Sequence, residues 1–335
     1  MINFAIVGYG HIGRRHATHI LENDQARLVA VCDTNEAAMA RAAEDGHQVF
    51  PSIDRMLDSI QADVVCVCTP NYLHMEHTVT ALRHGCHAIV EKPMALSTEE
   101  CDVMIAASEQ YGKMIFAVKQ NRYNEPVRLV KELIAAGKLG TILMVQVNCF
   151  WNRNDFYYAQ SSWRGKKQMD GGCLFTQFSH FVDILYYLNG DIAEAKGYVT
   201  NFLHRHNTEF EDTGVFSMKA VNGSIVNFNF TTCSFQKNME GSITLMGEKG
   251  TLKIGGQYLN TIEYQCIEGE QLPDVNITCK ANDYGAYSGS MSNHDKLIAN
   301  VIDVLLYGKP MTTTAAEGRK VISIIEKMYH GASGQ

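Results

Sequence analysis

The stretch that decides the fold is Ile6-Val7-Gly8-Tyr9-Gly10-His11-Ile12-Gly13. The apolar run 2–7 predicts a buried strand, the glycines predict a tight turn, and the apolar spacing after them is typical of a helix. Gly8 permits the turn, Gly10 lets the backbone approach a pyrophosphate, and Gly13 lets the helix pack closely on the strand. The start of that helix offers free N–H groups to phosphates. The stretch therefore predicts a dinucleotide site.

A carboxylate follows at the expected distance. The apolar run 26–32 predicts a second strand, which ends at Asp33, about 20 residues beyond the last glycine of the motif. A carboxylate there accepts hydrogen bonds from both ribose hydroxyls and repels a 2′-phosphate. The sequence therefore predicts NAD, not NADP, as the cofactor.

The alternation of strands and helices continues to about residue 119. Strands are predicted at 64–68, 87–90 and 114–118, and helices at 75–84 and 98–111. This order predicts an α/β domain with a doubly wound parallel sheet, which binds ligands at the carboxyl ends of its strands. Gly8, Asp33, Thr69 and Glu91-Lys92 all follow such ends.

In the C-terminal half, the alternation of strands and helices gives way to a series of successive strands. Helices are predicted at 125–136, 174–188, 295–307 and 315–329, and strands at 142–149, 193–203, 214–220, 224–232, 239–246 and 251–254. Val221-Asn222-Gly223-Ser224 is a hairpin signal. We therefore expect an α+β domain with a large, open, mostly antiparallel sheet. We expect the domain boundary after residue 119. The first domain, 1–119, is expected to bind the dinucleotide, and the second, 120–335, is expected to bind substrate and to form oligomers.

Composition narrows the class of protein. The 335 residues are 46% apolar and 19% charged, which suits two packed domains, and the net charge of −7 argues against a large nucleic-acid interface. No apolar run reaches the ~20 residues that a membrane span needs, and the N-terminus lacks a signal peptide. Ten cysteines scattered through apolar segments fit a reducing compartment, so we expect a cytoplasmic protein.

One segment is positively charged although the whole chain is negatively charged. Residues 119–168 carry nine Lys and Arg against three Asp and Glu, hence +6 in a chain of net −7. Aromatic side chains at 151, 156–158 and 163 lie among these cations. Aromatic faces beside fixed cations suit a nucleotide base and its pyrophosphate, and the alternative interpretation is a solvated surface loop.

The sequence resembles the Gfo/Idh/MocA family of NAD(P)-dependent oxidoreductases over essentially its whole length. The resemblance rests on Ile6–Gly13, Thr69-Pro70-Asn71-Tyr72-Leu73-His74, Val90-Glu91-Lys92-Pro93, and Gly171-Gly172-Cys173-Leu174 through His180 to Asp183. Residues 118–124 and 176–180 look most like the branch that oxidises the 3-hydroxyl of UDP-N-acetylglucosaminuronic acid. The resemblance implies a Rossmann domain, a mixed α/β domain, and a homodimer or homotetramer formed through the C-terminal sheet.

The resemblance also implies the catalytic pair, Lys92 and His180. Many relatives that act on inositols and free sugars carry an Asp where this chain has Thr176, so the resemblance favours the nucleotide-sugar branch. Oxidation of a secondary alcohol needs one group to take the hydroxyl proton and one to stabilise the alkoxide. We assign His180 as the base and Lys92 as the cation, although the two roles are interchangeable on sequence alone. Asp183 matches a family position that is expected to be structural or to orient other groups, and not to be the base.

Further site residues follow from the motifs and the resemblance. Thr176, four positions before His180, is expected on the same helix face and within reach of substrate. Glu91 is expected either to orient Lys92 or to meet a cofactor hydroxyl. The histidine spacings 74/77 and 84/87 lack grouped partner ligands, so no metal is predicted. The predicted cofactor contacts are Gly8, Tyr9, Gly10, His11, Ile12, Gly13, Asp33, Thr69, Pro70, Asn71, His74, Glu91, Lys92 and Gln120. The predicted substrate contacts are Lys92, Arg122, Tyr123, Asn124, Trp163, Arg164, Thr176, Gln177 and His180.

The sequence therefore predicts an NAD-dependent dehydrogenase of a CH–OH group, most similar to enzymes that act on UDP-N-acetylglucosaminuronic acid. A dehydrogenase of a free sugar, inositol or sugar acid is the first alternative. A non-catalytic NAD-binding regulator is the second. The resemblance also implies that the cofactor stays bound and is reoxidised by a 2-oxo acid.

Overall fold

The computed structural model describes residues 1–273, 281–283 and 288–333, which form two compact units. Unit 1 comprises Met1–Val118 and His294–Ile322, and unit 2 comprises Lys119–Asn293 and Ser323–Gln335. Among the described residues, no helix combines the length and the apolar character that crossing a membrane requires.

Unit 1 contains a six-stranded parallel sheet in the order β3-β2-β1-β4-β5-β6. Its strands are β1 (Ile2–Val7), β2 (Ala26–Cys32), β3 (Val49–Phe50), β4 (Val64–Val67), β5 (His87–Val90) and β6 (Ile115–Ala117). The alternating helices are α1 (His11–Leu21), α2 (Glu36–Glu44), α3 (Ile53–Ser59), η1 (Asn71–Leu73), α4 (His74–Arg83) and α5 (Thr98–Tyr111). The predicted doubly wound domain is confirmed.

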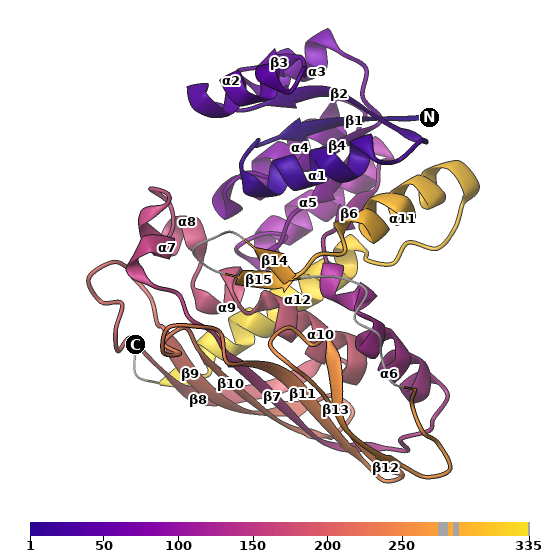
Figure 1. Ribbon diagram of the computed structural model, residues 1–335, viewed down its shortest axis with the longest axis vertical. Coiled ribbons are helices and arrows are strands. Elements are labelled where there is room, and N and C mark those ends of the chain that lie inside the picture. Colours follow the sequence, from indigo (N-terminus) through magenta and orange to yellow (C-terminus); the bar gives the residue numbers. More distant parts are fainter. Residues whose placement is uncertain (274–280, 284–287, 334–335) are drawn as a thin grey trace. The chain divides into compact units, whose positions relative to one another are not determined.

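Most residues in the strands of unit 1 are apolar, because helices cover both faces of the sheet. In Figure 1, α1 lies in front of the sheet and α4 and α5 lie behind it. All residues of β4 are fully buried. Burial of each such Val side chain contributes about 1.5–3 kcal/mol, which explains why β4 reads as an unbroken apolar run.

A late segment returns to unit 1, which differs from the single boundary expected from the sequence. Residues 294–322 belong to this unit and include α11 (His294–Tyr307), whose buried face packs near α1. The Thr313 hydroxyl donates to the carbonyl of Ala117 at 2.5 Å, and Thr314 pairs with Phe116 at the edge of β6. An amphipathic pattern shows that a helix has an apolar face but does not identify its partner, so the sequence could not place this segment.

Unit 2 contains an eight-stranded sheet in the order β13-β12-β11-β7-β10-β9-β8-β16. Its strands are β7 (Ile142–Phe150), β8 (Ile192–Thr200), β9 (Thr213–Ala220), β10 (Ile225–Thr231), β11 (Glu240–Gly247), β12 (Gly250–Gly255), β13 (Thr261–Ile267) and β16 (Ala332–Ser333). A separate pair is formed by β14 (Ala281–Asp283) and β15 (Ser288–Met291). The sheet is mostly antiparallel, as predicted, with parallel pairs between β10 and β7 and between β16 and β8.

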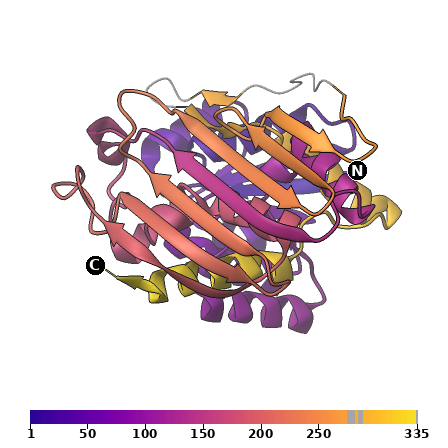
Figure 2. The same cartoon turned by 90° about the horizontal axis from the view of Figure 1, so that it is seen from below.

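Helices cover one face of this sheet. They include α6 (Glu125–Ala135), α10 (Ser179–Asn189) and the end of α12 (Ala315–His330), and shorter turns lie at η2 (Gln120–Tyr123), α7 (Asp155–Ala159), α8 (Lys167–Asp170) and α9 (Cys173–Thr176). On β9, Phe216 and Met218 are buried towards the helices, whereas Val215 and Lys219 are exposed on the other side. Figure 2 looks onto that other side, over which no helix of the described residues lies.

The helix predicted at 174–188 is in fact two helices. The carbonyl of Cys173 accepts hydrogen bonds from the backbone N–H groups of both Gln177 and Phe178, at 2.9 and 3.0 Å, and α10 then begins at Ser179. Thr176 therefore ends one helix and His180 lies in the first turn of the next. The expectation that these two residues share one helix face is wrong.

Candidate active site

The glycine turn between β1 and α1 has the shape that a pyrophosphate requires. Gly8 has φ +91°, and a Cβ on it would lie 2.6 Å from the Cys68 carbonyl oxygen. A Cβ on Gly13 would lie 1.9 Å from the Gly8 carbonyl oxygen, so helix and strand pack too closely for any side chain. A Cβ on Gly10 would meet nothing within 4 Å. The open space above Gly10 fits the close backbone approach that a dinucleotide makes.

Asp33 is held in place by backbone groups and still has acceptor capacity. One carboxylate oxygen accepts the Tyr9 N–H at 2.7 Å, and the other accepts the Asn35 N–H at 2.8 Å. Each oxygen of a carboxylate has a second lone pair, and the side chain is half-buried. Asp33 therefore fits the role of acceptor for a ribose diol.

Tyr9 connects this turn to the neighbouring helix. Its hydroxyl donates to Asp45 at 2.9 Å, and burial together with this contact raises the pKa of Tyr9 to about 12. The ring packs edge-on against His47. Tyr9 therefore stays neutral and stabilises the wall of the dinucleotide site.

His74 ties together the loops that follow β4 and β5. Its Nδ1 lies 2.7 Å from the carbonyl oxygen of Pro93, and its Nε2 lies 2.9 Å from the carbonyl oxygen of Thr69. Burial lowers the pKa of His74, whereas the two carbonyl acceptors favour its protonated form. Because both ring nitrogens bind backbone, His74 acts on the site by fixing the two loops. The Lys92–Pro93 peptide bond in one of these loops is cis.

Glu91, at the end of β5, lies between two histidines. Its Oε1 is 2.8 Å from Nε2 of His16 and 3.4 Å from Nε2 of His294, and its Oε2 accepts the backbone N–H of Lys92 at 3.2 Å. Burial alone would raise the pKa of Glu91, but the contacts with His16 and His294 outweigh burial and hold it well below its usual value. Of the two sequence interpretations of Glu91, the geometry supports the orienting one.

The sequence analysis missed both histidines. His16 lies on the apolar face of α1, beside Ala17 and one turn before Ile20, and all three are buried. A histidine on the buried, apolar face of a helix indicates a polar partner in the core, and this was the signal in the sequence. His294 gave no signal, because its partner is more than 200 residues earlier in the chain.

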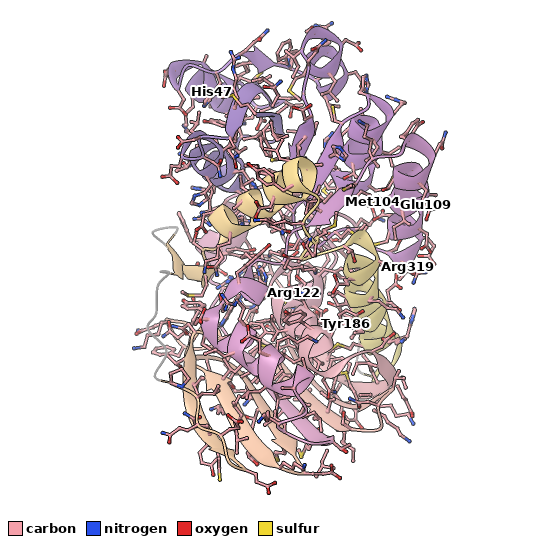
Figure 3. All side chains as sticks on the ribbon, turned by 90° about the vertical axis from the view of Figure 1, so that its right-hand side faces the viewer. His47, Met104, Glu109, Arg122, Tyr186 and Arg319 are labelled. Atoms are coloured by element: carbon pink, nitrogen blue, oxygen red, sulfur yellow. The ribbon has the colours of Figure 1, made fainter. Side chains whose placement is uncertain are left out.

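In unit 2, Arg122 faces an internal carboxylate. Its Nε and Nη2 donate to the two oxygens of Asp183 at 3.0 and 2.8 Å, and both side chains are almost fully buried. Lys119 lies 3.9 Å from the same carboxylate. Figure 3 labels Arg122, on η2, and Tyr186, on α10, the helix that carries Asp183. The guanidinium fork that was predicted to hold a substrate anion therefore binds Asp183.

Three other predicted substrate contacts also have internal partners. Asn124 donates to the carbonyl oxygens of residues 258 and 259 and accepts from the side chain of Asn293. Gln177 accepts from Nε of Arg153 at 2.6 Å. The Thr176 hydroxyl donates to the carboxylate and the carbonyl of Asp170. The hydrogen bonds of these three side chains to other protein groups are sufficient to explain why they are buried.

The aromatic and basic segment presents a stack at its half-exposed edge. The Arg164 guanidinium lies 4.4 Å from the ring centre of Tyr157 and 5.8 Å from that of Trp163. Arg164 also donates to the Tyr157 carbonyl at 3.1 Å and to the side chain of Gln160 at 2.6 Å. A cation beside aromatic rings suits recognition of a base or a phosphate, and the substrate contacts of Trp163 and Arg164 stay predictions.

The predicted catalytic pair is divided between the units. Lys92 is half-buried after β5 in unit 1, and His180 is buried in the first turn of α10 in unit 2. Their roles remain predictions, as do the substrate contact of Tyr123 and the cofactor contacts of His11, Ile12, Pro70, Asn71 and Gln120.

A second group of titratable side chains lies in unit 2. Nδ1 of His204 is 3.1 Å from Asp212 and 3.9 Å from the sulfur of Cys233. Burial, the largest single influence, disfavours the charged ring, but the contacts with Asp212, Cys233 and the Arg153 carbonyl together outweigh it and raise the pKa of His204 to about 10. Asp212 also accepts three backbone N–H groups of residues 202–204. The group therefore fastens the loop between β8 and β9.

The glycine turn, the carboxylate of Asp33 and the parallel sheet are typical of a dinucleotide-binding domain. Residues 2–119 match the family described as "Oxidoreductase family, NAD-binding Rossmann fold", and residues 127–253 match the GFO/IDH/MocA C-terminal domain. The chain belongs to the GFO/IDH/MocA family of oxidoreductases.

Solved structures extend this likeness over nearly the whole chain. The WlbA dehydrogenase from Bordetella pertussis, in complex with NADH and UDP-GlcNAcA, is 35% identical with a TM-score of 0.88 and covers 98% of this chain and 96% of its own. The WlbA dehydrogenase from Chromobacterium violaceum, in complex with the same two ligands, is 34% identical with a TM-score of 0.89 and covers 98% and 93%.

Curated relatives are named for several reactions. The 2,7-anhydro-N-acetylneuraminate hydratase of Escherichia coli (strain K12) is 30% identical over 77% of this chain and 68% of its own. The glucose-6-phosphate 3-dehydrogenase of Bacillus subtilis (strain 168) is 28% identical over 83% and 80%. The protein is thus an NAD-dependent dehydrogenase that acts on a CH–OH group of a sugar-type substrate.

Proposed function

We propose that the protein oxidises the 3-hydroxyl of UDP-N-acetylglucosaminuronic acid with NAD. The observation that carries this proposal is the 35% identity, over 98% of the chain, to a dehydrogenase crystallised with NADH and UDP-GlcNAcA. Two features of this chain support it. Thr176 stands where relatives that act on inositols and free sugars have an Asp, and Arg164 lies between Tyr157 and Trp163 in a segment of net positive charge.

In the proposed reaction, Lys92 and His180 act on one hydroxyl group. NAD, when bound, supplies the hydride acceptor. Nε2 or Nδ1 of His180 takes the hydroxyl proton, and the Lys92 ammonium stabilises the negative charge that develops on the oxygen. The Arg122–Asp183 pair holds η2 against α10, and therefore fixes the first turn of the helix that carries His180.

A substrate panel tests the proposal. The full-length protein is incubated with NAD and, separately, with UDP-N-acetylglucosaminuronate, UDP-N-acetylglucosamine, glucose 6-phosphate, glucose and myo-inositol. Products are identified by mass spectrometry, with and without a 2-oxo acid. We expect a ketone, 2 mass units below the substrate because two hydrogens are lost, only from UDP-N-acetylglucosaminuronate, and more than one turnover per protein only with the 2-oxo acid. Oxidation of glucose 6-phosphate or a free sugar alone would contradict the proposed substrate.

Substitution of the catalytic pair tests the mechanism. Lys92→Met and His180→Asn should each lower kcat by at least about 1,000-fold while NAD still binds, because the charge that each group stabilises develops only in the transition state. If His180 is the base, its variant should lose the acidic limb of the pH–rate profile and the Lys92 variant should lose the alkaline limb. Tight NAD binding without turnover on any substrate in the wild-type protein would favour the regulator instead.

We also propose that the uncovered face of the unit 2 sheet joins copies of this chain. The face exposes Tyr198, Val215, Ile225 and Met246 from four strands. Between them lies a row of hydrogen-bonded amides that includes Gln146 and Asn148. Light scattering after gel filtration should give two or four chains for the wild type. Tyr198→Glu with Ile225→Glu should give one chain of unchanged secondary structure, and an unchanged mass would exclude this face.

A further inference from the structure

The cluster of His16, Glu91 and His294 lies behind the predicted catalytic turn and has no part in the function proposed above. All three side chains are buried and come from three elements, α1, β5 and α11 of unit 1. The two imidazole rings meet edge to face with their centres 5.2 Å apart. A buried carboxylate is costly unless it is paired, so an arrangement that keeps one here needs a physical explanation.

The contact between His16 and Glu91 is a hydrogen bond. Nε2 of His16 is 2.8 Å from Oε1 of Glu91, which is a normal hydrogen-bond distance and shorter than the ~3.3 Å between two nitrogen or oxygen ligands of one tetrahedral zinc ion. Nε2 of His294 lies 3.4 Å from the same oxygen and makes no hydrogen bond to it. His16 therefore serves Glu91 as a hydrogen-bonding partner, and His294 serves it as an electrostatic partner.

The carboxylate reaches the catalytic turn through its other oxygen. Oε2 of Glu91 accepts the backbone N–H of Lys92, and Oε1 faces the two histidines. The helix that carries His16 begins at the glycine turn, which binds the pyrophosphate. One carboxylate thus connects the cofactor-binding helix, the backbone of Lys92 and the late helix α11.

We propose that Glu91, held by His16 and His294, is the positioning residue that fixes the direction and charge environment of Lys92. This inference rests on the role of Lys92 in the proposed function. A shift of about 1 Å in a reacting group can reduce turnover about 100-fold, so a fixed backbone at Lys92 has a direct effect on rate. The Glu91 carboxylate, which accepts the backbone N–H of Lys92, also adds a negative charge near that residue.

Other titratable groups surround the cluster and are kept constant in the test. Cys66 and Cys68 on β4 and His74 on α4 feel the charge of Glu91, and Arg15 acts on His294. None of them is altered in the variants below, so changes in the pH profile report on Glu91 and Lys92.

The experiment compares variants that separate charge from geometry. Glu91→Gln keeps the side-chain length and removes the charge, whereas Glu91→Asp keeps the charge and withdraws it by one methylene. We expect both to lower kcat about 100-fold, with the Kd for NAD and the KM for the sugar within about 3-fold of wild type. Only Glu91→Gln should move the alkaline limb of the pH–rate profile to lower pH, because an ammonium beside an amide loses its proton more readily.

Two variants of His16 separate loss of the hydrogen bond to Glu91 from loss of folding. His16→Gln keeps a donor for Glu91 and should retain kcat within about 5-fold, whereas His16→Leu should lower kcat like the Glu91 variants. The matched control is Glu100→Gln, because Glu100 accepts the N–H of Leu96 in the same loop at 2.8 Å without any histidine partner. Glu100→Gln should leave kcat and the pH profile unchanged. Circular dichroism and NAD titration establish that each variant is folded.

Several results would overturn the inference. They are wild-type kcat and pH profile in Glu91→Gln, equal losses in Glu100→Gln, or a stoichiometric metal that His16→Leu removes. If the proposed function is wrong, Lys92→Met should retain turnover. This result differs from those that would overturn the role of Glu91. An inactive Lys92→Met with a fully active Glu91→Gln would refute only the positioning role.

Discussion

The two units place their functional side chains by different physical means. In unit 1, Gly8, Asp33, Thr69 and Lys92 each follow the carboxyl end of a parallel strand, so the backbone of one sheet brings them to a common edge. In unit 2, η2, α9 and α10 are held by buried pairs of side chains that are far apart in sequence. Regular backbone therefore positions the predicted site residues of unit 1, and a polar side-chain network positions those of unit 2.

The difference has an energetic consequence. A strand end is fixed by many ladder hydrogen bonds, so a single side-chain change perturbs it little. A buried ion pair depends on each partner, because the loss of one leaves the other charge buried and unpaired. Unit 2 should therefore be the more sensitive to polar substitutions, and unit 1 to changes that add atoms at its glycine turn.

The largest effect is expected at the Arg122–Asp183 pair. Arg122→Met leaves Asp183 buried without its bidentate partner, and the free energy of unfolding should fall by about 3–5 kcal/mol in urea titrations. The double variant Arg122→Met with Asp183→Leu should recover most of that loss. Arg128→Met is the control, because Arg128 is half-exposed and its loss should cost less than about 1 kcal/mol. Unchanged stability with a raised KM would instead make Arg122 a substrate ligand.

A smaller effect is expected at the glycine turn, where two substitutions of equal size should behave differently. Gly13→Ala puts a Cβ 1.9 Å from the Gly8 carbonyl oxygen, so the free energy of unfolding should fall by about 1–3 kcal/mol. Gly10→Ala meets no protein atom within 4 Å and should keep the melting temperature of wild type. Its NAD affinity, measured by calorimetry, should nevertheless fall at least about 10-fold. Normal NAD binding by Gly10→Ala would contradict the assignment of the pyrophosphate to this turn.

The smallest effect depends on pH. The pKa of His204 is about 10 in the folded protein and about 6.5 when unfolded, so its stabilising contribution is complete below pH ~6.5 and is lost as the pH rises towards 10. The free energy of unfolding of wild type should therefore fall across this range more than that of His204→Gln. His206→Gln is the control, because His206 pairs with Asp155 at an exposed site and should follow wild type. Parallel curves for all three proteins would show that His204 is not charged.

The sequence predicted the features that depend on local pattern. Most strands, the glycine turn and the open sheet were confirmed, because apolar runs and turn residues encode them directly. The strands β3 and β13 were not predicted, and β8 ends at Thr200, before the predicted end at residue 203. The partner of Arg122 could not be predicted, since Asp183 is 61 residues away and nothing local marks the pair. The break between α9 and α10 was also missed, because the apolar spacing continues through residues 177 and 178 while backbone hydrogen bonding changes there.

The chain passes between the units after residues 118, 293 and 322, and this route has a consequence for biosynthesis. A ribosome makes the chain from its N-terminus, and domains generally fold as they emerge. Unit 1 starts first, yet it lacks α11 until residues 119–293 of unit 2 have been made. His294 thus reaches Glu91 only after that segment, and a product terminated before residue 294 would carry the glycine turn with a buried carboxylate that has His16 but not His294 beside it.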